Sequence, residues 1–234
     1  MTSTTEQQVV RVENLAKCNY HPDSEQAVNN LITILMNGCY ECHAMMYFFK
    51  RDDVALFGLA DFHEVLANQQ YRLCQKLMDY QILRGGRVQY GIIKAPSQES
   101  EWDDSIVSLE CCLDKFKSHN QNFTKLFSLA DDKNDPHLAN FVQHELVHCT
   151  NELICLIAKK ITKLKRAGNG LGEYSFDRDL GVWLNINFPE SIRSETSKAH
   201  KLTPEKLSTV NNVRNIARRV VKEIEEVAER FKQL

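Results

Sequence analysis

Glycine and proline are scarce in this chain of 234 residues, which has 9 of the first and 5 of the second. Because these two residues interrupt helices most strongly, their scarcity favours a mostly helical protein. No apolar run approaches the length of about 20 residues that crosses a bilayer, and residues 1–17 are polar, without the apolar stretch of a signal peptide. We therefore expect a cytoplasmic protein without a membrane partner, with access to the nucleus left open.

A strong charge of either sign is also absent. With 29 Lys and Arg against 31 Asp and Glu, the net charge is -2 and the isoelectric point is near 6.5. Nothing global therefore points to a nucleic acid or to a membrane surface. The chain has no Gly-rich phosphate-binding loop, which argues against the use of ATP.

Cysteine, by contrast, is abundant, with 8 residues. In a reducing compartment an even number of cysteines does not indicate a disulfide framework, and we expect most of them to pack as small apolar side chains. Cys18 is the exception, because it precedes the first predicted helix in a polar stretch. The sequence predicts that Cys18 is exposed and redox-reactive.

Four segments show apolar residues at spacings of three and four, a pattern typical of helices packed in a bundle. The first helix is expected to begin at the capping residues Asp23 and Ser24. The four predicted helices run from about 24 to 50, from 56 to 83, from after Asp104 to before Asn134, and from 136 to 166. Residues 85–102 would form the long crossover of a bundle whose second and third helices are parallel. A short fifth helix is predicted at about 171–180, so the predicted fold class is all-α.

The C-terminal residues 182–234 are predicted to form a separate extension. It opens with an apolar stretch, 182–188, that needs burial. Thr203-Pro204-Glu205 has the residue types of a helix start, and apolar residues then recur in heptads from Val210 to Phe231. We expect three regions: a flexible N-terminal arm at 1–18, a bundle with its fifth helix at 19–181, and the extension with its amphipathic helix at 182–234.

Five blocks of sequence closely resemble the ferritin family: Asn19–Glu25, Arg51–Leu56, Arg84–Arg87, Asp132–Leu138 and Glu173–Asp177. They occur in the family's order, with only small gaps. The resemblance implies a ferritin-like four-helix bundle with a long crossover and a short fifth helix, to which this chain adds an extra C-terminal helix. It also implies a homo-oligomer, a hollow shell of twenty-four subunits, and we expect the extension to lie inside that shell.

The resemblance also places the family's iron ligands on this sequence. Leu35, Gln70, Leu73 and Phe116 stand where the family has Glu, Glu, His and Glu, and Thr150 stands where it has Gln. Iron in such a site needs oxygen ligands and an imidazole, which hydrocarbon side chains do not supply. We therefore predict that the ferroxidase centre is lost, that the chain is not an enzyme, and that it holds no cofactor and no metal.

The predicted loss extends beyond that centre. By the same resemblance, Asn140 and Gln143 stand where the family lines its three-fold channel with acids. Gln69, Arg72 and Gln75 stand at inner-surface positions that nucleate mineral in other family members. Both sets lack the carboxylates that would attract iron cations, so iron oxidation, passage and nucleation are all predicted to be impaired.

Within the family, missing iron ligands, many cysteines and a long C-terminal extension occur together in artemin, the stress and dormancy protein of encysted crustacean embryos, which this chain resembles most. This likeness implies an iron-free cage that acts as an ATP-independent chaperone, with unfolded client proteins as partners and RNA as a further candidate. The alternative is a non-catalytic ferritin subunit that contributes to iron storage in mixed shells. Copies of the extension would crowd the mineral space of such a shell.

His144-Glu145-Leu146-Val147-His148 matches the His-Glu-x-x-His motif of zinc peptidases, in which two imidazoles bind the metal and the Glu is the general base. A second alternative is therefore a zinc metallopeptidase with His144 and His148 as ligands. The motif lies in the middle of the fourth predicted helix, and the sequence announces neither a third ligand nor a substrate cleft. A structural pair of histidines is the favoured interpretation.

Cys39-Tyr40-Glu41-Cys42-His43 matches the c-type haem attachment pattern. Haem attachment needs an exposed, flexible segment, whereas this one lies within the first predicted helix, with both cysteines on its apolar side. Buried cysteines that pack as small apolar residues are the favoured interpretation.

Overall fold

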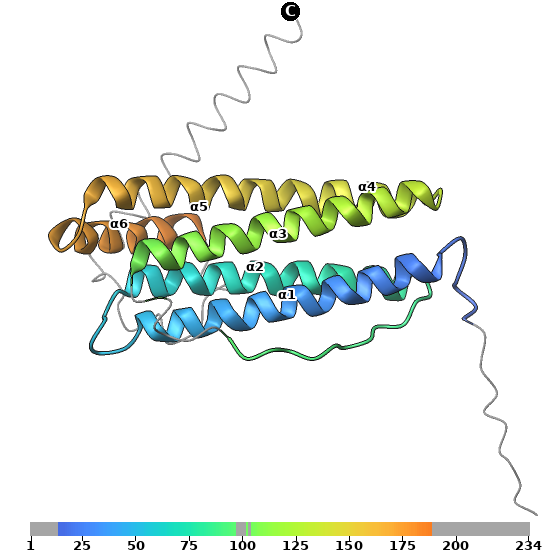
Figure 1. Cartoon of the computed structure of the whole chain (residues 1–234), viewed down its shortest axis with the longest axis horizontal. Helices are drawn as coiled ribbons and strands as arrows, with labels where there is room; N and C mark the ends of the chain where they lie inside the picture. The colour runs from blue at the N-terminus through green and yellow to red at the C-terminus, as the bar shows by residue number, and fades with distance from the viewer. Residues whose placement is uncertain (1–13, 97–101, 103, 189–234) are drawn as a thin grey trace, which may run out of the picture. The chain divides into compact units, whose positions relative to one another are not determined.

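The structure is a computed structural model that describes residues 14–96, 102 and 104–188 (Figure 1). All regular secondary structure within these residues is helical: α1 (Pro22–Phe49), α2 (Phe57–Leu83), α3 (Ser105–Asp132), α4 (Pro136–Phe141), the π-helical segment η2 (Val142–Val147), α5 (His148–Ala167) and α6 (Leu171–Asn187). The predicted all-α fold class is confirmed, with α4, η2 and α5 together forming the fourth long helix. None of these helices is long and apolar enough to cross a membrane.

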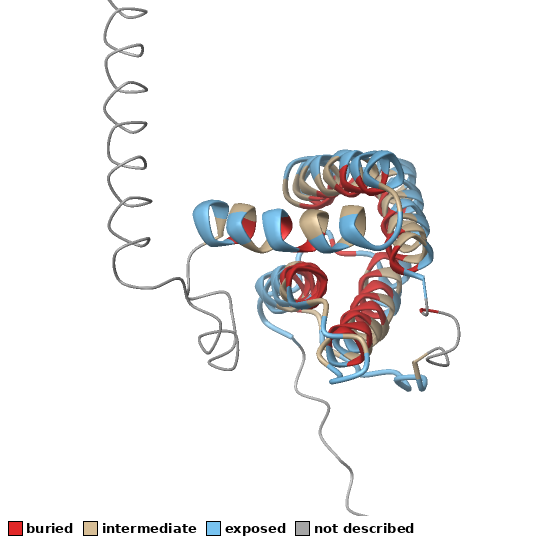
Figure 2. Ribbon diagram, turned by 90° about the vertical axis from the view of Figure 1, so that its left-hand side faces the viewer, coloured by how far each residue is buried: buried red, intermediate tan, exposed pale blue. Residues whose placement is uncertain are grey.

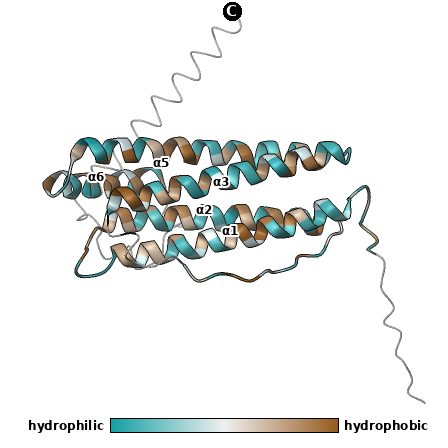
Figure 3. Ribbon diagram, viewed as in Figure 1, coloured by the Kyte–Doolittle hydropathy of each residue, from teal (hydrophilic) through white to brown (hydrophobic). Residues whose placement is uncertain are grey.

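The described residues form two compact units. The first comprises 14–44 and 66–166, and the second comprises 45–65 and 167–188. Most of the long helices are buried along one side and exposed along the other (Figure 2), whereas residues 58–70 of α2 include no exposed residue. Hydrophobic and hydrophilic residues are interleaved along the helices (Figure 3). The apolar sides of the first unit meet in one core cluster, whose members include Val28, Leu35, Leu77, Phe123 and Leu146.

The crossover between α2 and α3 is bonded to α1 by a row of side chains spaced four residues apart, which places them on one face of the helix. Each of these side chains accepts a hydrogen bond from a backbone N–H of the crossover: Glu25 from Arg87 at 2.9 Å, Asn29 from Gln89 at 2.9 Å, Thr33 from Gly91 at 3.2 Å and Asn37 from Lys94 at 2.6 Å. Residues 87–94 of the crossover therefore run beside α1 without regular structure (Figure 1), because these backbone donors find side-chain partners.

Arg84 joins the end of α2 to the start of α4. Its guanidinium lies over the rings of Tyr20 and Tyr80, 4.8 and 5.7 Å from their centroids, and it forms an ion pair with Asp135 at 2.9 Å. Asp135 also caps α4, because its carboxylate accepts a hydrogen bond from the backbone N–H of Leu138 at 3.0 Å. The Asp135 side chain is almost fully buried, so its charge depends on Arg84 for compensation.

The fourth long helix contains a turn that the sequence did not predict. Pro136 lies in its first turn, as predicted, but residues Val142–Val147 form π-helix. No Gly or Pro marks this segment, so its residue types predicted an uninterrupted α-helix. A π-helical turn widens the helix and shifts the phase of the side chains that follow it. The faces of α5 are therefore rotated relative to those expected from a regular α-helix.

The start of α1 also differs from the prediction. The helix begins at Pro22, and the imidazole of His21 accepts the backbone N–H of Asp23 at 3.1 Å. Asp23 and Ser24 therefore lie within the first turn instead of capping it. Asp104 does cap α3, since its carboxylate accepts from Ile106 N at 2.6 Å.

In the second unit, Asp177 bonds α6 to the start of α2. Its carboxylate accepts the backbone N–H of Leu59 at 2.7 Å, and Gly58 lies so close to the Asp177 backbone that a Cβ there would overlap it.

α6 continues to Asn187, well past the predicted end near 180, because Leu184 extends its buried side. Only part of the apolar stretch 182–188 is buried in the single chain, since Ile186 is exposed. The predicted C-terminal helix with its heptads lies outside the described residues, as do residues 1–13.

Candidate functional site

The positions that the family resemblance assigns to iron ligands lie in the interior of the first unit. Leu35 and Phe116 are completely buried, and Leu73 is 4% exposed. Leu35 and Leu73 belong to the same core cluster, and the ring of Phe116 packs edge-on against that of His119, with the centroids 5.8 Å apart. Three separate helices, α1, α2 and α3, thus contribute hydrocarbon side chains at these positions.

Gln70 and Thr150 are the two polar residues of the set, and both are buried. The hydroxyl of Thr150 donates to the carbonyl of Leu146 at 2.7 Å, a bond within its own helix. The amide of Gln70 donates from Nε2 to Sγ of Cys42 at 3.1 Å, while its Oε1 has no hydrogen-bond partner among the described residues. Both side chains are neutral, so neither offsets the charge of a cation.

Gly38 and His119, which the sequence did not single out, complete this region. Gly38 lies in the middle of α1, where a Cβ would overlap Oε1 of Gln70 and lie 3.0 Å from Cε1 of His119. His119 is buried, and its Nδ1 has no hydrogen-bond partner within the described part of the chain. Burial and the nearby charge of Lys115 lower the pKa of His119 to about 4, so the imidazole is neutral at pH 7. An isolated glycine inside a helical pattern was the available sequence signal.

Gly38→Ala is expected to destabilise the protein, although alanine is the better helix former by about 1 kcal/mol. The added methyl group would overlap the carbonyl of Gln70, and overpacking of this kind costs about 1–3 kcal/mol. Urea unfolding followed by circular dichroism measures the change. Gly181→Ala is the matched control, because a Cβ there meets only Cα of Gly58, at 3.7 Å. Equal stability of the two variants would contradict the packing described above, and adding Gln70→Ala to Gly38→Ala should recover part of the loss.

The His-Glu-x-x-His residues lie in and beside the π-helical segment. Glu145 forms an ion pair with Lys76 of α2 at 2.5 Å, and the hydrogen bond from Lys76 lowers the pKa of the Glu145 carboxyl. His148 is exposed and lies 3.6 Å from Glu152, and His144 is exposed as well. In the described ranges of the chain, no three His, Cys, Asp or Glu side chains are grouped so that they could hold a metal ion. The structure therefore brings no third ligand to the two histidines.

The cysteines differ in exposure. Cys39 and Cys42 of the haem-like motif are buried in the middle of α1, whereas haem attachment needs an exposed segment. Cys18 is exposed, as the sequence predicts, but Cys155 on α5 is exposed too, and the sequence did not single it out. Cys155 has both polar and apolar neighbours on the helix. The sequence therefore does not predict whether its side chain is buried or exposed.

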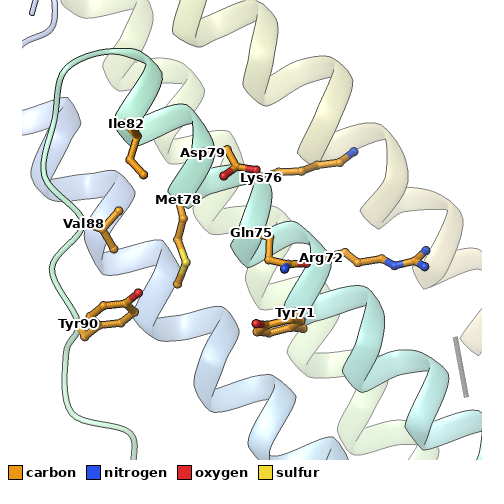
Figure 4. Close-up of a pocket in the computed structure, with 9 residues that line it drawn as sticks. All are labelled: Tyr71, Arg72, Gln75, Lys76, Met78, Asp79, Ile82, Val88 and Tyr90. Carbon is orange, nitrogen blue, oxygen red and sulfur yellow. The ribbon is translucent and has the colours of Figure 1, made fainter. Parts of the chain in front are cut away.

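The positions that the resemblance relates to iron passage and nucleation are at the surface. Asn140 and Gln143 are exposed on the fourth helix, and Arg72 and Gln75 are exposed on α2, with Gln69 half-buried. A groove of about 630 Å³ lies between α2 and the crossover (Figure 4). Its lining mixes apolar, aromatic and charged side chains: Tyr71, Arg72, Gln75, Lys76, Met78, Asp79, Ile82, Val88 and Tyr90. Asp79 is its only carboxylate against two cations, so this groove does not favour iron ions.

The second unit holds a buried histidine that the sequence did not single out. His63 stacks on Phe49 with the ring centroids 5.1 Å apart, and its Nδ1 lies 2.8 Å from the carbonyl of Leu59. Its Nε2 has no hydrogen-bond partner among the described residues. Beside it, Lys50 and the buried Glu64 form an ion pair at 3.7 Å. Burial lowers the pKa of His63 to about 4.

Acidification is expected to destabilise the protein through His63. Its pKa is about 4 in the folded chain against 6.5 normally, so only the unfolded state gains a proton as the pH falls below about 6.5. Stability from this group is complete above that pH and is lost toward pH 4, by about 2 kcal/mol between pH 7 and pH 5. His63→Phe keeps the ring contact with Phe49 and should remove this part of the loss. Urea unfolding of the wild type and of His63→Phe at pH 8 and pH 5 tests this prediction. An equal loss of unfolding free energy between the two pH values in both proteins would contradict it.

Comparisons with known proteins agree with the helical architecture. The model of the Ferritin-like domain family matches residues 25–167. Similar proteins include a "Ferritin, middle subunit" of Aquarana catesbeiana, 39% identical over 163 residues, which are 68% of this chain and 92% of that protein. The "Soma ferritin" of Lymnaea stagnalis is 36% identical over 70% of this chain and 94% of its own length. A "Ferritin, middle subunit" of Salmo salar is 35% identical over 71% of this chain and 96% of its own. With this match over more than half of its length, the chain belongs to the ferritin family.

Proposed function

We propose that this chain is a ferritin-family subunit without ferroxidase activity, and that it is not an enzyme. The observation that carries the proposal is the complete burial of Leu35 and Phe116, with Leu73 buried in the same core cluster as Leu35, at positions assigned to iron ligands. A bound iron ion needs charged or polar ligands to replace its water, and these side chains offer none. One substitution could be offset by a neighbour, whereas three on separate helices leave no ligand set.

We further propose that copies of the chain assemble as an iron-free shell of twenty-four subunits in the cytoplasm and hold unfolded client proteins under stress. The likeness to artemin supports this role, and it also makes RNA a candidate partner. The absence of a Gly-rich phosphate-binding loop from the sequence favours passive holding without ATP. Passive holding needs apolar surface, and the crossover carries some of it, since Ile92 is 87% and Tyr90 is 74% exposed in the single chain.

Light scattering of heated citrate synthase tests the chaperone role. Citrate synthase is heated alone, with the purified assembly in equimolar amount, and with bovine serum albumin in equal mass. We expect the assembly, without ATP, to suppress scattering well beyond the albumin control. Unchanged scattering with both the reduced and the oxidised assembly would refute the chaperone role and leave the proposal of a ferroxidase-free subunit standing.

A non-catalytic subunit of mixed iron-storing shells is the second candidate. Two of the relatives are named as middle subunits, which favours this candidate because such names imply more than one kind of subunit in those proteins. Co-expression with a ferroxidase-active ferritin subunit distinguishes the two functions. Mixed shells that contain this chain and retain mineral would favour shared storage, whereas separate shells without iron would favour the chaperone.

A further inference from the structure

Five of the eight cysteines lie in one region of the first unit, on α1, α2 and α3. Cys74 on α2 lies near Cys39 on α1, which lies near Cys42 one turn further along the same helix. Cys42 is hydrogen-bonded to Cys112 of α3, and Cys112 is adjacent to Cys111. Four of the five are buried, and Cys111 is half-buried. Three helices thus contribute thiols to this region.

Cys42 and Cys112 are the pair whose thiols share a hydrogen bond. Both are completely buried, and the hydrogen bond between their thiols, followed by burial, raises the pKa of Cys112 well above its usual range. Cys42 also accepts a hydrogen bond from the amide of Gln70 at 3.1 Å. Lys115, which pairs with Glu41 at 2.6 Å, is close enough to favour the thiolate of Cys112. Two soft ligands from different helices therefore face each other, with one N–H donor and one cation beside them.

We propose that Cys42 and Cys112 bind one soft monovalent cation, Cu(I), as a two-coordinate dithiolate site. Thiolates select Cu(I) over the hard cations that carboxylates hold. Two metal–sulfur bonds of about 2.3 Å, the length known for zinc, span about 4.6 Å, so the hydrogen-bonded sulfurs must move apart slightly to close the site. Zn²⁺ would need four ligands, but no group of three or more His, Cys, Asp or Glu side chains that could hold a metal occurs within the described residues.

Binding is a proton-for-metal exchange without electron transfer. Cu⁺ displaces the two thiol protons to the buffer, and the product is an anionic dithiolate complex with a net charge of -1. The N–H of Gln70 and the ammonium of Lys115 lie beside this charge. Burial also keeps water away from the bound Cu(I). The site differs in ligand type and in metal from an iron centre, and it depends on neither proposed function.

Anaerobic Cu(I) titration of the assembled full-length protein against the chelator bicinchoninate tests the site. The titration uses the Cys18→Ser/Cys155→Ser background, because these two exposed thiols would bind Cu(I) adventitiously. We expect one equivalent per chain to resist the chelator, with a thiolate-to-copper absorption band in the near ultraviolet. Cys42→Ser and Cys112→Ser should each abolish this equivalent, whereas Cys74→Ser, whose thiol donates to the carbonyl of Ile32, should retain it. Gln70→Ala should retain the stoichiometry and weaken binding by about 10–100-fold.

X-ray absorption of the copper-loaded background protein gives a readout that needs no variant of the site itself. Two sulfur neighbours and no oxygen or nitrogen neighbour are expected. The proposal is overturned if no equivalent resists the chelator, if the Cys42→Ser/Cys112→Ser double variant retains it, or if the absorption spectrum shows oxygen or nitrogen ligands. Circular dichroism and sedimentation confirm that each variant compared is folded and assembled.

Discussion

Fe²⁺ mixed with the purified protein in air is expected to oxidise no faster than in buffer alone. Leu35, Leu73 and Phe116 fill the positions assigned to iron ligands with packed hydrocarbon, and a cation placed there would lose its water without gaining ligands. The appearance of ferric absorbance, followed in parallel with a ferroxidase-active ferritin, measures the rate. An oxidation rate above buffer that grows with protein concentration would contradict the prediction, provided that chelation of trace copper leaves it unchanged.

Restoring the ligand types should recover little of this activity. The variant Leu35→Glu, Gln70→Glu, Leu73→His, Phe116→Glu supplies three carboxylates and an imidazole, but without metal it buries like charges in the core. Asn140 and Gln143 would still leave the path of iron without acids, if the family's channel forms here. We expect a less stable protein with ferroxidase activity well below that of the active ferritin used as reference. Full activity would show that ligand loss at the four positions is the only defect.

Arg84→Met is expected to lower the free energy of unfolding by about 3–5 kcal/mol, because it leaves the buried charge of Asp135 without its partner. It also removes the contacts of the guanidinium with the rings of Tyr20 and Tyr80. Urea unfolding followed by circular dichroism measures the loss. Arg51→Met is the matched control, since Arg51 pairs with Asp53 on the surface, where an ion pair contributes about 0–1 kcal/mol.

Similar losses in Arg84→Met and Arg51→Met would refute this role for Arg84. A second variant separates charge from shape. Arg84→Met combined with Asp135→Asn removes both charges and keeps an oxygen that can cap α4. We expect this pair to be more stable than Arg84→Met alone, because the uncompensated carboxylate is gone.

The residues by themselves determined the helical architecture and several of the places where helices begin or end. Gly85 ends α2 with a φ of 72°, a conformation that glycine adopts without a Cβ clash. Asp104 caps α3, and Pro136 begins α4. The apolar spacing placed Leu35, Leu73 and Phe116 in the core, where all three are buried. These features follow from interactions among near neighbours in the chain, so the sequence order is sufficient to predict them.

Tertiary packing decided the rest. α6 extends to Asn187 because Leu184 finds a buried place, and Gly38 is required in α1 because Gln70 and His119, far along the chain, occupy the space of its side chain. The contact of Cys42 with Cys112 joins two helices that no local pattern relates. In each case the deciding free energy comes from groups that are distant in sequence and close in space, which periodicity and helix propensity do not encode.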